Sequence, residues 1–69
     1  MKVFVFKTSI HLEHVPLINT ILRSVIPECF WNYDLEDCDR ILKVKSHKNI
    51  TASVCFHLKM EGFYCEELQ

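Results

Sequence analysis

The stretch "KVFVFKTSI", residues 2–10, decides how this 69-residue sequence can fold. It is rich in β-branched and aromatic residues, and its side chains alternate in character, which is typical of a strand with one buried face. The alternation assigns two faces: Phe4, Phe6, Thr8 and Ile10 on one, and Val3, Val5 and Lys7 on the other. We expect the face that carries the two phenylalanines to lie in the core.

A helix is predicted directly after this strand, over residues 12–26. Pro16 fits only the first turn of a helix, so the helix is expected to start near residues 13–15, and Pro27 ends it. Apolar residues recur at spacings of three and four and form one stripe, which two further residues widen: Val15, Ile18, Leu22 and Val25, with Leu17 and Ile21 beside them.

Two more strands are predicted on either side of a polar turn. Residues 30–36 and 40–45 both alternate, and "EDCD" (residues 36–39) lies between them. Asp side chains readily bond their own backbone, so this turn favours an antiparallel hairpin. Four side chains of the hairpin are expected to face the core: Trp31, Tyr33, Leu42 and Val44.

The last third of the chain predicts a second helix and a fourth strand. The helix covers residues 50–61, with Asn49 as its N-cap. Gly62, the only glycine, is positioned as the left-handed residue that ends this helix. "FYCEEL" (residues 63–68) then predicts the last strand.

The order of these elements is β-α-β-β-α-β, and it predicts one architecture. Right-handed crossovers in both halves give a four-stranded antiparallel sheet with two helices on one face, the ferredoxin-like sandwich of the α+β class. We expect residues 1–69 to form a single domain, since no linker or low-complexity segment interrupts them.

Composition argues against several classes of function. Eight Lys and Arg residues are scattered against nine Asp and Glu, so the basic stripe of a nucleic-acid-binding protein is missing. No apolar run approaches the roughly 20 residues of a membrane helix, and "MKVFVFK" becomes charged too early for a signal peptide. We therefore expect no nucleic-acid partner, no membrane insertion, and a cytoplasmic location with reduced cysteines.

Enzymatic activity is not expected. One glycine cannot build a phosphate loop, and no serine–histidine–acid pattern stands out. Among the cysteines, Cys55 and Cys65 are predicted to be small core residues, whereas Cys29 and Cys38 lie at opposite ends of one strand. An acidic group in the hairpin lacks the glycine of a calcium loop and is interpreted as a solvated turn: Asp34, Glu36, Asp37 and Asp39.

Three stretches carry a resemblance to a known family: "VFVFKTSI" (residues 3–10), "WNYDLED" (residues 31–37) and "MEGFYCEEL" (residues 60–68). Together with the element order and the apolar stripe of the first helix, these stretches resemble the heavy-metal-associated domains of copper chaperones and metal-transporting ATPases. The resemblance covers nearly the whole chain. The resemblance implies a ferredoxin-like fold and the binding of a soft ion by the two thiolates of a CxxC motif after the first strand.

The CxxC motif itself is absent, and two alignments of its position stay open. If the helix stripes are matched, His11 and His14 occupy the two cysteine positions, so that "HLEH" replaces CxxC. If the first strand is matched, Leu12 and Val15 occupy them. The two alignments differ by one residue.

The first hypothesis for function is therefore a divergent metal site. His11 and His14 lie three residues apart near a helix start, and Glu13 adds an oxygen ligand. Imidazole and carboxylate groups suit Zn(II), Ni(II) or Cu(II) better than Cu(I). The alternative is that these are ordinary polar residues of an exposed loop.

The second hypothesis is a metal-free interaction module. If the aromatic face of the sheet meets the helices, four residues are expected on the opposite, open face: Val3, Val5, Ile41 and Tyr64. An exposed apolar patch of that kind marks a surface for a protein partner or for a second copy in a homo-oligomer.

Overall fold

The computed structural model describes residues 1–68. Seven elements follow one another along the chain: β1 (Lys2–Thr8), the 3₁₀ turn η1 (Leu12–His14), α1 (Val15–Val25), β2 (Phe30–Asp34), β3 (Ile41–Ser46), α2 (Thr51–Met60) and β4 (Cys65–Leu68). The predicted β-α-β-β-α-β order is confirmed. The first and last strands are shorter than predicted, since β1 ends at Thr8 and β4 begins only at Cys65.

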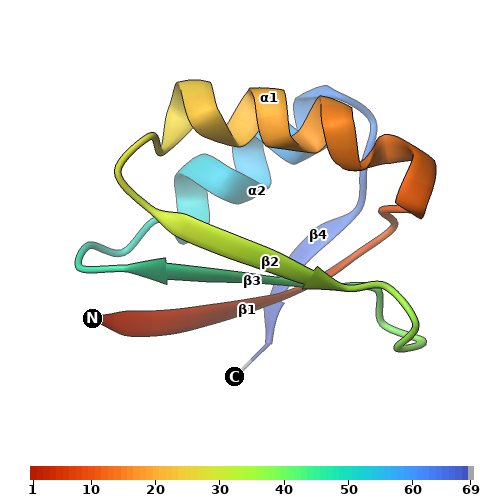
Figure 1. Ribbon diagram of the computed structural model, residues 1–69, viewed down its shortest axis with the longest axis horizontal. Helices are drawn as coiled ribbons and strands as arrows, with labels where there is room; N and C mark the ends of the chain where they lie inside the picture. The colour runs from red at the N-terminus through yellow and green to blue at the C-terminus, as the bar shows by residue number, and fades with distance from the viewer. Residues whose placement is uncertain (69) are drawn as a thin grey trace.

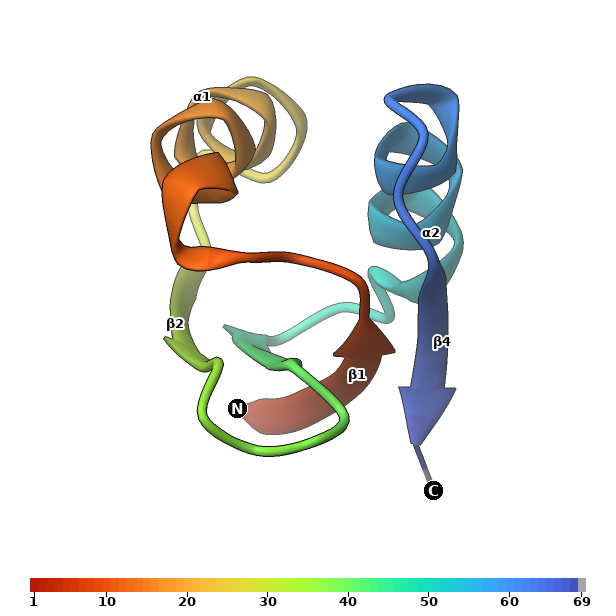
Figure 2. The same cartoon turned by 90° about the vertical axis from the view of Figure 1, so that its right-hand side faces the viewer.

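The four strands form one antiparallel sheet in the order β2-β3-β1-β4. Both helices lie on the same face of this sheet, and the other face is left uncovered (Figures 1 and 2). This is the predicted ferredoxin-like arrangement. Neither α1 nor α2 has the length and apolarity that a helix needs to cross a membrane.

The core lies between the sheet and the helices, and the alternation of β1 defines it. Phe4 and Phe6 point into it with exposed fractions of 7% and 0%, whereas Val3 on the other face is 54% exposed. The neighbouring strand β3 contributes Leu42 and Val44, which are fully buried. The helices close the core from above with four fully buried side chains: Ile18, Leu22, Val54 and Leu58.

The first helix differs from its prediction at the N-terminal end. Residues 12–14 form a 3₁₀ turn, and the α-helix begins only at Val15, with Pro16 in its first turn as its missing N–H requires. Leu17 does not widen the apolar stripe, because it is 45% exposed. Ile21 is partly buried against the core as predicted.

The second helix begins one residue later and ends one residue earlier than predicted. Asn49 is not the N-cap, which is Ile50, but its Oδ1 accepts a hydrogen bond from the backbone N–H of Thr51 at 3.0 Å. Gly62 has a φ of +91°. The N–H groups of Gly62 and Phe63 donate back to the last helical turn at 3.0 and 2.9 Å, which is a Schellman ending.

A shared hydrogen-bond acceptor fixes α1 to the edge strand β2. The side-chain oxygen Oδ1 of Asn19 accepts from Trp31 Nε1 at 3.0 Å and from the hydroxyl of Tyr33 at 2.8 Å. Both aromatic rings therefore lie half-buried on the helix side, as predicted. Burial raises the pKa of Tyr33 to about 12, so its hydroxyl keeps the proton that it donates.

We predict that Asn19→Ala lowers the free energy of unfolding by about 2 kcal/mol, because two partly buried donors lose their acceptor at about 1 kcal/mol each. Thermal unfolding measures this as a fall in midpoint of roughly 10 °C. Ser24→Ala is the matched control, since Ser24 is exposed on the same helix. An equal loss of unfolding free energy in the two variants would contradict a stabilising role for the two hydrogen bonds that Asn19 accepts.

The Tyr33 hydroxyl also makes stability depend on pH in the alkaline range. Its pKa is raised in the folded protein, so its stabilising contribution is complete below pH 10, the pKa of the unfolded chain, and is lost as pH rises toward about 12. In a Tyr64→Phe variant, tyrosinate absorbance should rise with a midpoint near 12 when the protein is folded. In concentrated urea the midpoint should return to about 10. A folded midpoint at 10 would contradict burial of this hydroxyl.

Candidate functional site

The loop between β1 and α1 holds the three residues of the predicted metal site. His11 and Glu13 are exposed, and His14 is half-buried. The imidazole rings of His11 and His14 meet edge to face, with 5.6 Å between their centroids, and the ring of His14 also packs against Phe63 at 4.9 Å. The ligand atoms of all three residues do not gather within 4.8 Å of one another.

A hydrogen bond occupies the ring nitrogen of His14 that faces this loop. The backbone N–H of His11 donates to His14 Nδ1 at 3.0 Å. Because Nδ1 accepts, the neutral ring carries its proton on Nε2, which then has no lone pair for a metal. A metal-bound imidazole normally donates its second N–H instead. In this conformation His14 therefore stabilises the start of η1 and is not prepared as a ligand.

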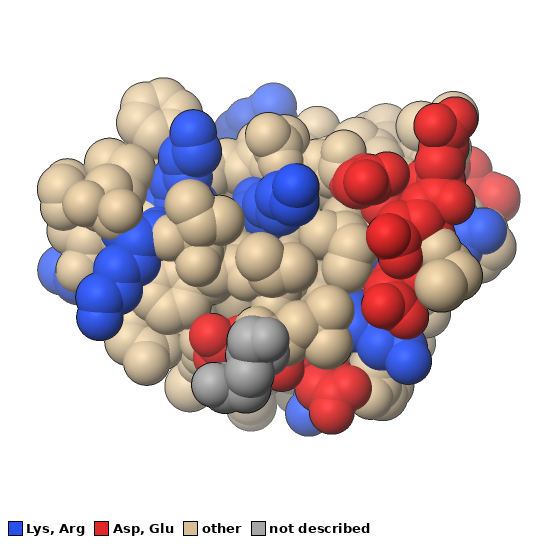
Figure 3. All heavy atoms as spheres, turned by 90° about the horizontal axis from the view of Figure 1, so that it is seen from below, with Lys and Arg blue, Asp and Glu red and all other residues tan. Residues whose placement is uncertain are grey.

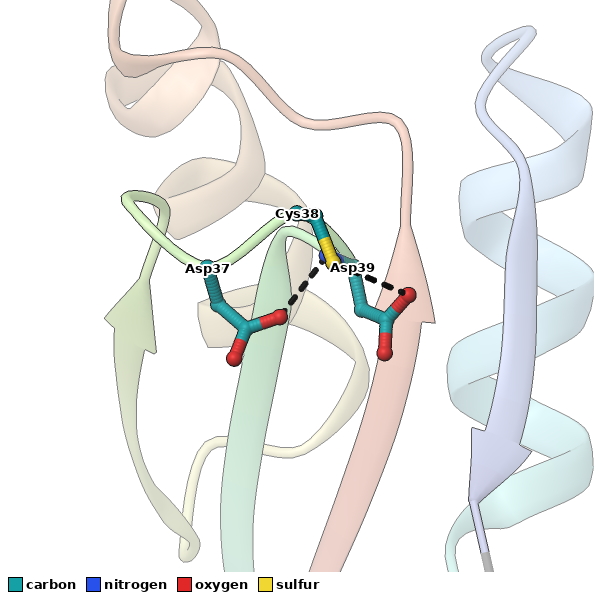
Figure 4. Close-up of side chains that lie close together, drawn as sticks. All are labelled: Asp37, Cys38 and Asp39. Carbon is teal, nitrogen blue, oxygen red and sulfur yellow. Dashed lines mark hydrogen bonds between the residues drawn. The ribbon is translucent and has the colours of Figure 1, made fainter.

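A second group of metal-binding atoms lies in the β2–β3 hairpin. Within residues 1–68, Asp37, Cys38 and Asp39 are the one group of three whose ligand atoms lie within 4.8 Å of one another (Figure 4). The triplet "DCD" is the sequence signal for it. The carboxylates point to the same side of the turn, with the Cys38 sulfur beside Asp39 (Figure 4).

The same atoms also have an ordinary structural role in the turn. Asp37 Oδ1 accepts the backbone N–H of Asp39 at 2.8 Å, and Asp39 Oδ1 lies 3.6 Å from Lys7 Nζ. Bonds of an Asp side chain to the backbone two residues further on are the usual way in which such turns close. The interpretation of this region as a solvated hairpin turn therefore accounts for its geometry.

The uncovered face of the sheet carries three rows of side chains that run across the strands. The strand registers and the alternation on each strand give the rows as Phe30, Lys45 and Val3; then Asn32, Lys43, Val5 and Leu68; then Asp34, Ile41, Lys7 and Glu66, with Tyr64 beyond the last. The first row borders a shallow hollow of about 110 Å³.

Three of the four residues predicted for an interaction face are accessible to solvent. Val3 and Tyr64 are 54% and 49% exposed, and Val5 is half-buried. Ile41 belongs to this face by its register, between Lys7 and Asp34, but it is only 7% exposed and therefore offers little apolar surface there.

Charge on the open face differs between its two ends. Lys43 and Lys45 lie in the first two rows, whereas the third row holds Asp34 and Glu66 together with Lys7, which pairs with Asp39 of the acidic hairpin. Figure 3 views this face directly: most acidic side chains gather at its right-hand end, where basic side chains lie among them, and its left and middle parts carry mainly basic side chains.

The structure also brings together two cysteines that were predicted only as separate core residues. The sulfur atoms of Cys55 in α2 and Cys65 in β4 lie 3.2 Å apart. All four cysteines of the chain are free thiols. The sequence signal for the pair was available, since both residues lie close to the turn at Gly62 that reverses the chain.

Comparisons with protein-family models, with curated proteins and with solved structures find no match to this chain. The resemblance to heavy-metal-associated domains therefore stays a prediction from the sequence.

Proposed function

We propose that this protein is a non-enzymatic, self-associating module and that two copies pack together through their open sheet faces. The observation that carries the proposal is an open face that exposes apolar side chains, is basic at one end and is mainly acidic at the other. Phe30 and Val3 are 68% and 54% exposed at the basic end of this face. A sheet face with this composition is typical of an interaction surface.

Charge complementarity selects a second copy of the same chain as the partner. A two-fold axis that lies in the interface and runs across the strands reverses the strand direction of one sheet relative to the other. The first row of each copy then lies over the third row of the other, so that Lys45 approaches the row of Asp34 and Glu66, and this contact is repeated twice. The middle rows, which hold Lys43, lie over each other at the axis. Such self-complementary two-fold interfaces are the commonest in homo-oligomers.

The helix side of the molecule lacks this complementarity. It has an apolar groove between α1 and α2 that includes Val25, Phe56 and Met60. Phe56 and Met60 are exposed there, but no separation of charge along the groove indicates what would cover it. The open sheet face is therefore the better-supported interface.

We predict a weak dimer whose dissociation constant is in the micromolar range, because one face of so small a domain falls at the low end of interface sizes. Sedimentation equilibrium over a range of protein concentrations measures it. The dimer should weaken as salt rises from about 0.1 M to about 1 M, since the Debye length falls from about 10 Å to about 3 Å. A protein that stays monomeric at millimolar concentration would overturn the proposal.

Charge reversal at each end of the face tests the arrangement of the two copies. The variants Lys43→Glu/Lys45→Glu and Asp34→Lys/Glu66→Lys should each be monomeric, because like charges then meet at both ends of the interface. Mixed in equal amounts, they should form a heterodimer. Lys59→Glu in α2 is the matched control and should dimerise like the unchanged protein. Dimerisation of either double variant alone would contradict the face-to-face arrangement.

Metal binding at His11 and His14 is a second candidate function. It is supported by the resemblance of the sequence to heavy-metal-associated domains and by the 5.6 Å between the ring centroids. It ranks below self-association because binding at His14 Nε2 requires the ring proton to move to Nδ1. The hydrogen bond from the His11 backbone would then be lost.

A metal site at these histidines predicts stabilisation of the reduced, chelator-stripped protein by Zn(II), Ni(II), Cu(II) or Cu(I). At about 100 times the dissociation constant, a bound ion adds roughly 2.7 kcal/mol to the free energy of unfolding. The gain should vanish in His11→Ala/His14→Ala and persist in His47→Ala, the matched control. If the stabilisation by metal were lost only in Cys38→Ser, the ion would bind at the hairpin. If no ion stabilised the protein, metal binding would be rejected.

A further inference from the structure

Cys55 and Cys65 form a pair of thiols at the contact between α2 and β4. Their Sγ atoms are 3.2 Å apart and share a hydrogen bond. Cys65 is 2% exposed and belongs to the core, whereas Cys55 is half-buried on the helix. Neither sulfur belongs to the predicted metal site or to the open sheet face.

The backbone brings the two sulfurs to the same level of the molecule. From Cys55 to the end of α2 the helix rises about 7.5 Å at about 1.5 Å per residue. After the turn at Gly62, the extended chain from Phe63 to Cys65 returns by about 7 Å at about 3.3 Å per residue. Figure 2 shows α2 and β4 running side by side after this turn.

A second contact holds the helix and the strand in this register. The hydroxyl of Thr51, at the start of α2, donates to Glu67 Oε1 of β4 at 2.7 Å. The first residue of α2 is therefore attached to β4 by this hydrogen bond, and the last turn of α2 is attached to it by the turn at Gly62. The sulfur pair lies between these two attachments, so its separation is a consequence of the fold.

We propose that Cys55 and Cys65 are a redox-sensitive pair that closes into an intramolecular disulfide when the protein meets a peroxide. The net reaction is the oxidation of two thiols by one hydrogen peroxide, which gives one disulfide and two waters. Peroxide is the two-electron acceptor, and each thiol gives up one hydrogen.

The two thiols have different roles in this reaction because their environments differ. Cys55 is the more accessible sulfur and reacts first: its thiolate attacks the peroxide and keeps one oxygen as a sulfenic acid, and the other oxygen leaves as water. The Cys65 sulfur then attacks the Cys55 sulfur, and the sulfenic oxygen departs as the second water. Burial, with the hydrogen bond to Cys55, raises the pKa of the Cys65 thiol, so Cys65 is the resolving residue and not the one that reacts with peroxide.

The disulfide would fix β4, an edge strand of the sheet, to the helix that covers it. It closes a loop between residues ten apart in the chain. A crosslink of this kind limits the conformations of the unfolded chain and stabilises the folded one. We therefore expect oxidation to raise the midpoint of thermal unfolding by roughly 10 °C.

Peptide mapping after peroxide treatment tests the proposal. Trypsin cleaves after Lys48 and Lys59, which places Cys55 in peptide 49–59 and Cys65 in peptide 60–69. The folded protein is treated with hydrogen peroxide, its remaining thiols are alkylated under denaturing conditions, and the digest is analysed by mass spectrometry. The expected product is the two peptides joined, with the loss of two hydrogens, and separate again after reduction.

Two variants separate this reaction from other thiol chemistry. Cys38→Ser removes the exposed thiol, and it should leave both the crosslinked peptides and the rise in unfolding midpoint unchanged. Cys55→Ser should abolish both; if that variant does not fold, the peptide map of the Cys38→Ser protein decides alone. Recovery of Cys55 and Cys65 as alkylated thiols, as sulfinic acids, or in disulfides to other cysteines would overturn the proposal.

Discussion

The alternation of side chains along β1 is the constraint on which the rest of the structure depends. β1 is paired on both sides, to β3 and to β4, so its two faces become the two faces of the sheet. Because side chains alternate with a period of two, a shift of one residue would turn Phe4 and Phe6 out to solvent and Val3 and Val5 into the core. The burial of the two phenylalanines therefore selects the face that the helices cover.

The covered face and the open face have different consequences for function. On the covered face, polar groups are few and each has a partner: within residues 1–68, no buried side-chain nitrogen or oxygen lacks a hydrogen bond. Asn19 is an example, since one side-chain oxygen accepts two bonds from β2. On the open face Tyr64 donates to Glu66 and Lys7 pairs with Asp39, but exposed apolar side chains and the lysines of β3 remain available to another molecule.

The loop after β1 illustrates how a motif depends on its hydrogen bonds. "HLEH" has the residue types and spacing of a site for a borderline metal ion, but the backbone of His11 uses the ring nitrogen of His14 as an acceptor. The bond contributes to the start of η1, where backbone N–H groups have no partner within the helix. Chain geometry gives this histidine a structural role that residue spacing alone does not reveal.

Local sequence patterns by themselves determined the element order, the ferredoxin-like architecture, the core face of β1 and the end of α2 at Gly62. These features depend on periodicity and on single-residue backbone preferences, which act over a few neighbouring residues. Only the tertiary structure decided the burial of Ile41, the exposure of Leu17 and the distribution of charge over the open face. Each of these depends on side chains that meet only after strands and helices distant in the sequence have packed together, and so no local pattern specifies them.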